Sequence, residues 1–172
     1  ELADGLLNTR GSPVHLNKTL ANLVSNAAEA LAGSGEITIR TENRYLDVPI
    51  QGYDSMKEGD YTILSVSDTG KGISERDMGK IFEPFYTNKV MGRSGTGLGL
   101  AVVWGTVKDH DGYIDVRSEE GVGSTFTIYL PVTREEIARR KKVIDSLAYR
   151  GKGETILVVD DIKEQRELAI NM

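Results

Sequence analysis

Apolar residues recur at helical spacing near the start of the chain. They are separated alternately by four and three residues, the period of one buried helix face: Leu16, Leu20, Leu23, Ala27 and Leu31. Ser12 and Pro13 precede this pattern, where an N-cap and a first helical residue are favoured. Because Gly33 and Gly35 follow it, we predict an amphipathic helix that ends there.

Shorter patterns predict four strands. Apolar and polar residues alternate, as in half-buried strands, over 37–42, 113–117 and 125–130. A fourth stretch, 61–66, is mainly apolar, and the polar loop before it contains Pro49, so we expect it to form a hairpin with 37–42. The last two strands are expected to form another hairpin around a turn at 119–123.

Glycine is concentrated between the two predicted hairpins, from Asp68 to Gly99. A long irregular segment inside a compact domain is usually functional or disordered. A short helix is expected within it, around residues 75–81. A second long helix is predicted from about Gly97 to just before Asp111, because four apolar residues share one face: Leu100, Val103, Trp104 and Val107.

The amino-acid composition limits the binding partners and the cellular compartment that we expect. The 172 residues include 21 Lys and Arg against 26 Asp and Glu, a formal charge of −5, and no cysteine. Nucleic acid is not an expected partner, because no basic run is interleaved with aromatic residues. The lack of cysteine fits a cytoplasmic location. No apolar run reaches the ~18 residues of a membrane span, which leaves the membrane attachment of a longer parent open.

A charged stretch separates two unequal parts of the chain. Residues 1–132 contain all the elements above and are predicted to be one domain. Residues 133–153 are rich in Arg, Lys and Glu and end in a pair of glycines, which indicates a helical linker. Residues 154–172 begin with an apolar strand that ends in Asp160 and Asp161, as the start of a second domain would.

Two asparagines share one face of the first predicted helix. Asn22 and Asn26 stand four residues apart and lie away from the leucine stripe. An amide carbonyl is a neutral oxygen ligand of the kind that suits Mg²⁺. On their own, such residues are more simply explained as a solvated helix face.

A carboxylate and two glycines follow the predicted strand 61–66. Asp68 ends that strand, and Gly70 and Gly72 let a ligand approach the backbone. A buried carboxylate there would accept a hydrogen bond from the exocyclic amine of adenine, while Ile73 would pack against the ring. An ordinary turn explains the same residues.

More glycines precede or open the second long helix. Backbone amides and a positive helix end are therefore available for phosphate oxygens at Gly92, Gly95, Gly97 and Gly99. Their spacing fits neither a P-loop nor a dinucleotide-binding turn. Lys89 and Arg93 in the same stretch would either neutralise a terminal phosphate or belong to a solvated loop.

Taken in order, these segments resemble the histidine kinase branch of the superfamily that also contains DNA gyrase and the heat-shock chaperone ATPases. The similar segments are 22–27 for the asparagine box, 68–73 for the first glycine box, 82–85 for the phenylalanine box and 95–100 for the second glycine box. The resemblance covers residues from about 12 to 131. Four motifs in the right order are far more specific than any one of them.

The resemblance implies an α/β fold in which helices cover one face of a mixed β-sheet, as a two-layer sandwich with a mobile ATP lid at roughly 86–97. The implied cofactors are ATP and Mg²⁺. By this carry-over, Asn26 binds Mg²⁺, Asn22 assists at the metal and the phosphates, and Asp68 reads adenine. Thr125 supports the adenine end through water. The phosphates are held by Gly95, Thr96, Gly97, Leu98 and Gly99.

One position departs from the family pattern. Many members place a basic residue three positions after the metal-binding asparagine, where this chain has Glu29. Residues 86–89 resemble the lid of the nitrogen-regulator type of sensor kinase. Lys89 is therefore the expected replacement for the missing positive charge, ahead of Arg93.

The asparagine box also bears on the reaction. Hydrolytic relatives carry a glutamate as general base where this chain has Asn22. An amide cannot take a proton at neutral pH, so we expect phosphotransfer to a protein rather than hydrolysis. His15 and His110 lie at helix ends, where packing or capping roles are expected. The resemblance implies that the phosphoacceptor histidine lies outside the chain, on a helical hairpin that also makes the parent a homodimer.

Two other functions are open. An anti-sigma-type serine kinase shares the nucleotide fold, and a degenerate kinase would keep the fold as a non-catalytic nucleotide-binding module. Intact boxes argue against the second function. Residues 154–161 resemble the first strand of a receiver domain, which argues against the first and implies a hybrid sensor kinase of two-component signal transduction.

Overall fold

The structure is a computed structural model that divides into two units, Glu1–Ile137 and Ala138–Met172. Lys89, Arg93 and Gly95 lie outside the described residues, and so do nearly all of the predicted linker and of the receiver-like segment. The fold below is that of the first unit. The structure describes residues 1–31, 33–47, 49–51, 55–87 and 96–135, with Thr155, Leu157 and Val159.

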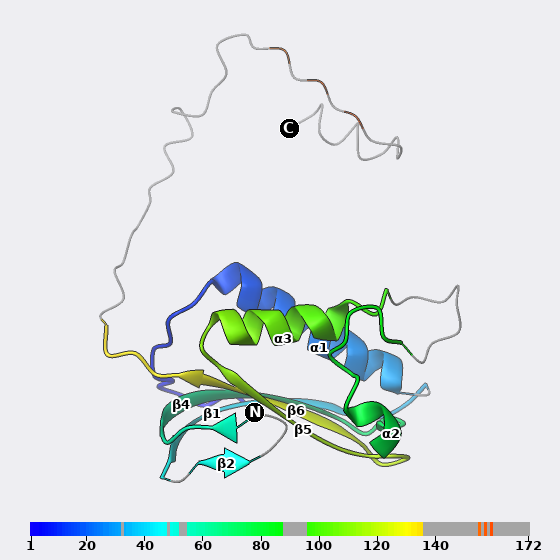
Figure 1. Ribbon diagram of the computed structural model, residues 1–172, viewed down its shortest axis with the longest axis horizontal. Coiled ribbons are helices and arrows are strands. Elements are labelled where there is room, and N and C mark those ends of the chain that lie inside the picture. The colour runs from blue at the N-terminus through cyan, green and yellow to red at the C-terminus, as the bar shows by residue number, and fades with distance from the viewer. Residues whose placement is uncertain are drawn as a thin grey trace. The chain divides into compact units, whose positions relative to one another are not determined.

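A four-stranded sheet forms one layer of this unit (Figure 1). Its order is β1-β4-β6-β5, and every pairing in it is antiparallel. The mixed sheet that we predicted is therefore corrected: both predicted hairpins are present, hairpin connections make their strands antiparallel, and β6 also runs opposite to β4. The strands are β1 (Ile37–Leu46), β4 (Gly59–Asp68), β5 (Tyr113–Glu119) and β6 (Gly123–Pro131).

Two helices form the second layer, on one face of the sheet (Figure 1). They are α1 (Pro13–Ala30) and α3 (Gly99–Asp109), and a short helix, α2 (Glu75–Met78), lies between them in sequence. Ser12 caps α1 as predicted, since its hydroxyl accepts a hydrogen bond from the His15 amide. The expected two-layer α/β fold is thus confirmed.

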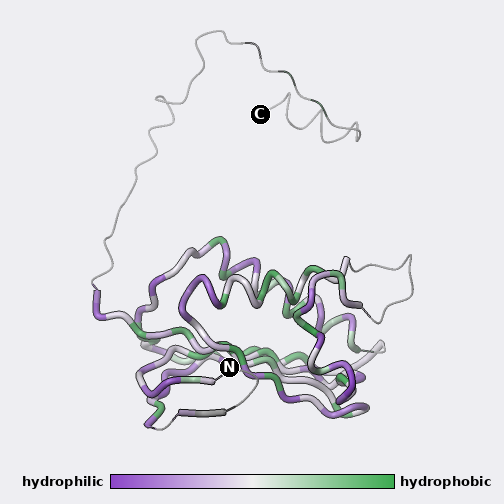
Figure 2. Tube along the Cα trace, viewed as in Figure 1, coloured by the Kyte–Doolittle hydropathy of each residue, from purple (hydrophilic) through white to green (hydrophobic). Residues whose placement is uncertain are grey.

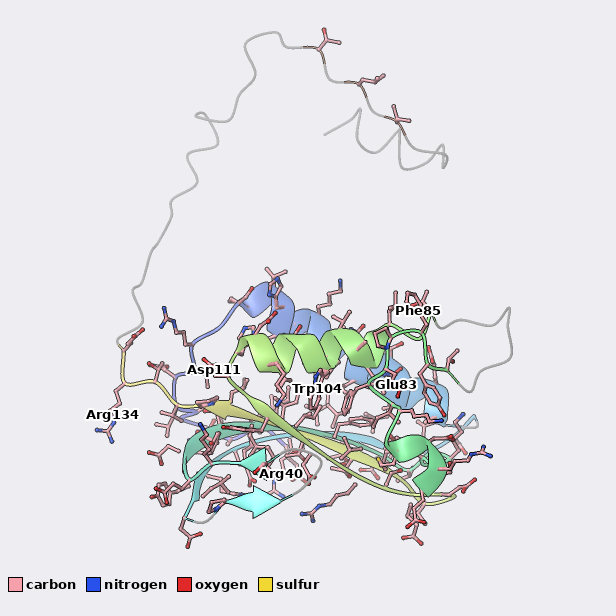
Figure 3. All side chains as sticks on the ribbon, viewed as in Figure 1. Arg40, Glu83, Phe85, Trp104, Asp111 and Arg134 are labelled. Atoms are coloured by element: carbon pink, nitrogen blue, oxygen red, sulfur yellow. The ribbon has the colours of Figure 1, made fainter. Side chains whose placement is uncertain are left out.

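The main core lies between the helices and the sheet. Leu23 of α1, Val107 of α3 and Ile114 of β5 are each at most 1% exposed, and each such burial contributes about 1.5–3 kcal/mol. Figure 2 shows hydrophobic residues along both helices and the central strands. Trp104 of α3 points toward the sheet (Figure 3) and packs on Phe82, with 5.1 Å between ring centroids. The helical periodicity of the sequence thus predicts the buried faces.

A smaller core lies on the other face of the sheet. The segment that we expected to be a loop contains a two-stranded sheet, β2 (Ile50–Gln51) and β3 (Ser55–Met56). Its Met56 packs with Leu46, Tyr61, Ile63 and Tyr129. Burial raises the pKa of the Tyr61 and Tyr129 hydroxyls above their usual value.

In the described parts of the chain, no helix has the length and apolar character that crossing a membrane requires.

Candidate active site

A cavity of about 750 Å³ lies between the helix layer and the sheet, within the range of small-molecule sites. It collects residues from both predicted glycine boxes and from the asparagine box. Gly70, Leu98 and Thr125 do not line it. The predicted site residues that do are Asn22, Asn26, Asp68, Gly72, Ile73, Thr96, Gly97 and Gly99.

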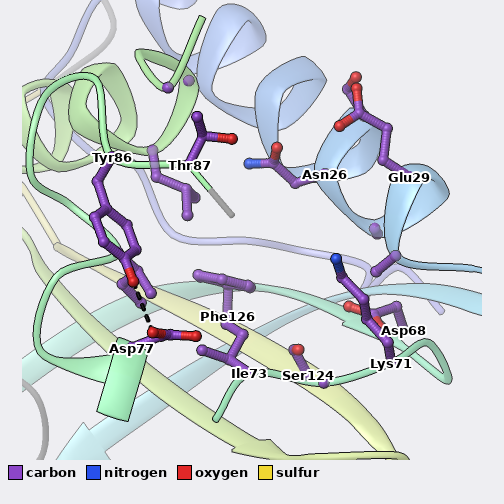
Figure 4. A pocket seen from close by; sticks show the side chains of 18 of the residues that line it. Asn26, Glu29, Asp68, Lys71, Ile73, Asp77, Tyr86, Thr87, Ser124 and Phe126 are labelled. Carbon is purple, nitrogen blue, oxygen red and sulfur yellow. Dashed lines mark hydrogen bonds between the residues drawn. The ribbon is translucent and has the colours of Figure 1, made fainter. Parts of the chain in front are cut away.

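The end of β4 forms the floor of the cavity. Asp68 is 8% exposed, and its Oδ1 accepts a hydrogen bond of 2.9 Å from the Gly70 amide. Figure 4 shows Asp68, Ile73, Ser124 and Phe126 along this floor. A nearly buried carboxylate beside apolar side chains suits a flat ligand that carries one hydrogen-bond donor.

Ser124 takes the place that we expected for Thr125. The register pairs Asp68 with Ser124 and Ser67 with Thr125. Successive side chains of a strand point to opposite faces, so Ser124 lines the cavity while the Thr125 hydroxyl lies 3.0 Å from that of Ser67. The alternation along this strand was the signal that could have separated them, because Ser124 lies two residues before the core residue Phe126 and Thr125 does not share that face.

The glycines of the first box have a structural reason beyond ligand access. A Cβ on Gly70 would lie 2.6 Å from the Ala30 carbonyl oxygen at the end of α1. Gly72 has φ +68°, and a Cβ there would lie 2.1 Å from the Glu119 oxygen. Both positions require glycine because this loop is wedged between α1 and the β5–β6 turn.

Helix α1 supplies the wall that carries the two asparagines. Asn22 Nδ2 donates a hydrogen bond of 3.3 Å to the Gly99 carbonyl, which ties α1 to the start of α3. Asn26 Nδ2 is buried and has no hydrogen-bond partner among the described residues. Whichever way this amide is turned, one of its buried polar atoms has no partner among the described residues, which is rare in folded proteins.

The start of α3 faces the same space. Leu98 occupies the N-cap position without a side-chain hydrogen bond, and the first turn of α3 holds no acidic residue. The Gly97 carbonyl accepts a hydrogen bond of 3.0 Å from the Phe85 amide, and Gly97 has φ +67°. Backbone amides at an uncapped helix start are available to anions, which the helix dipole also favours.

The opposite wall contains a hydrogen-bonded pair that the sequence did not indicate. The Tyr86 hydroxyl donates to Asp77 Oδ1 at 2.7 Å (Figure 4), and the Ser74 hydroxyl donates to Asp77 Oδ2 at 2.8 Å. Asp77 is 8% exposed. Hydrogen bonds to a carboxylate of this length are strong, so Asp77 fixes the position of Tyr86 on the cavity wall.

Charged side chains around the cavity have an acidic excess. In the described lining, Lys71 and Arg76 are outnumbered by four carboxylates, an excess of two negative charges. No group of three or more His, Cys, Asp or Glu residues suited to a metal ion occurs among the described residues. The four carboxylates belong to Glu29, Asp68, Asp77 and Glu120.

The two histidines lie at the other end of α1. His110 Nε2 accepts a hydrogen bond of 2.9 Å from the Ser12 amide, and its Nδ1 lies 2.6 Å from the Thr106 carbonyl oxygen. The His15 ring packs edge-on against the His110 ring, with 6.4 Å between centroids. Both histidines line a second hollow and neither lines the cavity; the contacts of His110 fit the expected packing or capping role, while the His15 ring is exposed.

The comparisons with known proteins agree with this geometry. The profile of the histidine kinase-, DNA gyrase B- and HSP90-like ATPase family matches residues 11–134. Sensor kinase CckA of Brucella abortus is 40% identical over 148 residues, which are 81% of this chain and 16% of that protein. Sensor histidine kinase ZraS of Escherichia coli K12 is 40% identical over 129 residues, 75% of this chain and 24% of that protein. The chain thus spans a sixth to a quarter of the length of these relatives.

Solved structures show the same fold. The catalytic domain of histidine kinase ThkA is 30% identical, with a TM-score of 0.59 and coverage of 77% of this chain and 76% of that one. Full-length ShkA in complex with AMPPNP has a TM-score of 0.59 at 24% identity, with coverage of 77% and 24%. The chain belongs to the histidine kinase-, DNA gyrase B- and HSP90-like ATPase family, as a catalytic ATP-binding domain of the sensor histidine kinase type.

Proposed function

We propose that the cavity binds ATP with Mg²⁺ and presents the γ-phosphate to a histidine on a separate dimerisation domain, in two-component signal transduction. The observation that carries this proposal is Asn22. It lines the cavity where the hydrolytic relatives of the family place a general base, and its amide donates to the Gly99 carbonyl. An amide cannot accept a proton from water at neutral pH, so the site favours transfer of the phosphoryl group over hydrolysis.

Each end of the nucleotide has a complement in the cavity. The Asp68 carboxylate is available to accept a hydrogen bond from the adenine amine, and Ile73 and Phe126 supply apolar surface for the ring. The phosphates would meet the uncapped start of α3, where Thr96, Gly97 and Gly99 line the cavity. Adenine and the phosphates are thus assigned to opposite sides of the same cavity.

The residues present also fit a bound cation. The unpartnered amide of Asn26 offers one oxygen ligand beside the expected phosphate position, with Asn22 one turn away on the same helix face. When bound, Mg²⁺ supplies positive charge that offsets the phosphates and the acidic walls. The protein residues orient the nucleotide, and they leave the γ-phosphate to a nucleophile from outside the chain.

The acceptor must come from another domain. Both ring nitrogens of His110 lie within hydrogen-bonding distance of the backbone, and His15 lies at the end of α1 that is remote from Asn26. Transfer requires close approach of nucleophile and phosphate. We therefore infer that the acceptor histidine lies on a helical hairpin of the parent protein, and that the parent is a homodimer. ATP is a cytoplasmic substrate, so we place this domain in the cytoplasm.

Labelled ATP tests this proposal. We expect the purified chain to remain unlabelled alone, and a separately supplied dimerisation domain of the parent to acquire label that is lost in acid, as phosphohistidine is. Acid-stable label on a serine would favour the anti-sigma-type kinase instead. Rapid turnover of ATP by the chain alone, abolished by Asn22→Ala, would contradict phosphotransfer as the function.

The end of the chain supports a further part of this proposal. Residues 154–161 read Glu-Thr-Ile-Leu-Val-Val-Asp-Asp, a mainly apolar run that ends in paired acids, and they follow the kinase domain after a charged stretch. We propose that the parent is a hybrid kinase, in which a receiver domain takes the phosphoryl group onward. A parent sequence in which the receiver domain that begins at residue 154 is not completed after residue 172 would contradict this part alone.

A further inference from the structure

Glu29 stands on the same wall of the cavity as Asn26. It comes three residues later on α1, so the two side chains share one helix face, and both line the cavity. Figure 4 shows them projecting from the same helix above the floor. The other carboxylates of the described lining come from the end of β4, from α2 and from the β5–β6 turn: Asp68, Asp77 and Glu120. Glu29 is thus the acid that α1 itself brings to the cavity.

The negative charge around the cavity disfavours binding of a polyphosphate without a cation. Without Glu29, the described lining has an excess of one negative charge, and Glu29 raises this excess to two; the negative charges repel the phosphates. A basic residue at position 29 would relieve the repulsion by direct contact with phosphate. A glutamate at this position cannot contact the phosphates in this way, whereas a divalent cation held between its carboxylate and the phosphates would relieve the repulsion.

The neighbouring groups suit such an ion. Mg²⁺ is usually held through one or two carboxylates together with substrate phosphates. The amide of Asn26 combines an oxygen ligand with an N–H donor, and its buried nitrogen lacks a partner in the described part of the chain. The described residues hold no cluster of three acids or histidines, so the site becomes complete only when a nucleotide supplies its phosphates.

We propose that Glu29, together with Asn26, is a ligand of the divalent cation that accompanies the nucleotide. Position 29 then sets how strongly nucleotide binding depends on the cation: glutamate recruits the cation, whereas a basic residue contacts phosphate and makes the cation dispensable. This inference rests on the proposed function, and it adds a residue for which the sequence motif gave no role.

Calorimetry can isolate this role. AMP-PNP binding to the whole chain would be measured in Mg²⁺ and in EDTA for the wild type, Glu29→Gln, Glu29→Lys and Glu58→Gln. The Kd in EDTA divided by the Kd in Mg²⁺ measures how strongly binding depends on the cation. Glu58→Gln is the matched control, because it removes one negative charge from an exposed position outside the cavity lining.

The three variants have different expected results. Glu29→Gln lowers the ratio roughly tenfold, the order expected when one charged ligand is lost, through weaker binding in Mg²⁺ and tighter binding in EDTA. Glu29→Lys binds AMP-PNP in EDTA more tightly than the wild type and brings the ratio close to one. Glu58→Gln keeps the wild-type ratio.

A second readout does not depend on affinity. With Mn²⁺ in place of Mg²⁺, the electron paramagnetic resonance spectrum of the nucleotide complex should change in Glu29→Gln and stay unchanged in Glu58→Gln. Mn²⁺ without nucleotide should bind far more weakly, since the phosphates complete the site.

Two results would overturn the inference. Equal loss of affinity in Mg²⁺ and EDTA would assign Glu29 to the fold or to the nucleotide rather than to the cation. Cation-independent binding by the wild type would overturn this inference while leaving the ATP site in place. If the wild type binds no nucleotide in either condition, the proposed function fails and this inference fails with it.

Discussion

The two ends of α1 differ in whether their polar groups have hydrogen-bond partners. At the first turn, Ser12 caps the helix and donates its amide hydrogen to His110. Near the last turn, Asn26 keeps a buried amide nitrogen without a partner among the described residues, and α3 begins beside it without a side-chain cap. Because folded proteins pair nearly all buried polar groups, we propose that the paired end stabilises the fold and that the unpaired end binds a ligand.

The contrast is not complete. Thr19 Oγ1, in the middle of α1, is the other buried side-chain atom without a partner in the described residues, and it lies outside the cavity lining. Nothing in the structure explains it. The contrast between the two ends still makes a clear prediction: substitutions at the paired end reduce stability, and substitutions at the unpaired end reduce nucleotide affinity.

The largest effect is expected at the unpaired end. Asn26→Ala should weaken binding of the Mg²⁺–nucleotide complex roughly a hundredfold, since it removes a cation ligand and a phosphate donor together. The free energy of unfolding without ligand should stay within about 0.5 kcal/mol of the wild type, because the amide has no partner to lose. Calorimetry and chemical denaturation measure the two quantities. A large loss of stability would show that Asn26 is structural.

The opposite result is expected at the paired end. His110→Ala removes an acceptor from the Ser12 amide and a contact with the Thr106 carbonyl, so the free energy of unfolding should fall by about 2 kcal/mol. Nucleotide Kd should stay unchanged at temperatures where the variant is folded. His15→Ala is the matched control and should change stability little, because His15 is exposed. A change in Kd caused by His110→Ala would break the contrast.

A smaller effect on affinity is expected across the cavity. Tyr86→Phe keeps the ring but removes the hydrogen bond to Asp77, so nucleotide affinity should fall roughly three- to tenfold through a less well-positioned wall. Tyr61→Phe is the control: its hydroxyl also donates one hydrogen bond, to the Lys57 carbonyl, outside the cavity lining. It should lower thermal stability only. Equal nucleotide affinities for the two variants would show that the hydrogen bond between Asp77 and Tyr86 does not contribute to nucleotide binding.

The smallest effect concerns the helix cap. Ser12→Ala should destabilise the fold by about 0.5–1 kcal/mol, in the lower part of the range for such caps because the hydrogen bond is long, at 3.4 Å. Thermal unfolding would measure the change, and nucleotide affinity should not move. Ser34→Ala, in the exposed loop after α1, provides the reference for a serine without a capping role.

Features that depend on neighbouring residues could be predicted from the sequence. The helix that starts at Pro13, both hairpins and the glycine-rich start of α3 follow from local periodicity, capping and turn residues. The pairing of β4 with β6 could not be predicted, because it joins strands that are far apart in the chain. Our expectation of a mixed sheet came from the family resemblance, and the observed pairings corrected it.

The site residues also differ in whether they could be predicted from neighbouring residues in the sequence. Asn22, Asn26 and Asp68 could be chosen because each belongs to a short motif on one element, and all three line the cavity. The bond between Asp77 and Tyr86 depends on how an irregular segment folds back, which no local pattern encodes. Ser124 was missed for a different reason: Thr125 came from the family resemblance, whereas the alternation along its own strand places Ser124 on the same face as the core residue Phe126.

The most direct test of the account compares two nucleotides that differ at the base. Asp68 would accept a hydrogen bond from the adenine amine, whereas guanine presents a carbonyl oxygen at that position. Calorimetry in Mg²⁺ should give one AMP-PNP bound per chain, a guanosine analogue bound roughly a hundredfold more weakly, and loss of AMP-PNP binding in Asp68→Ala. Equal binding of both nucleotides, undiminished in Asp68→Ala, would contradict the assignment of this cavity as the ATP site.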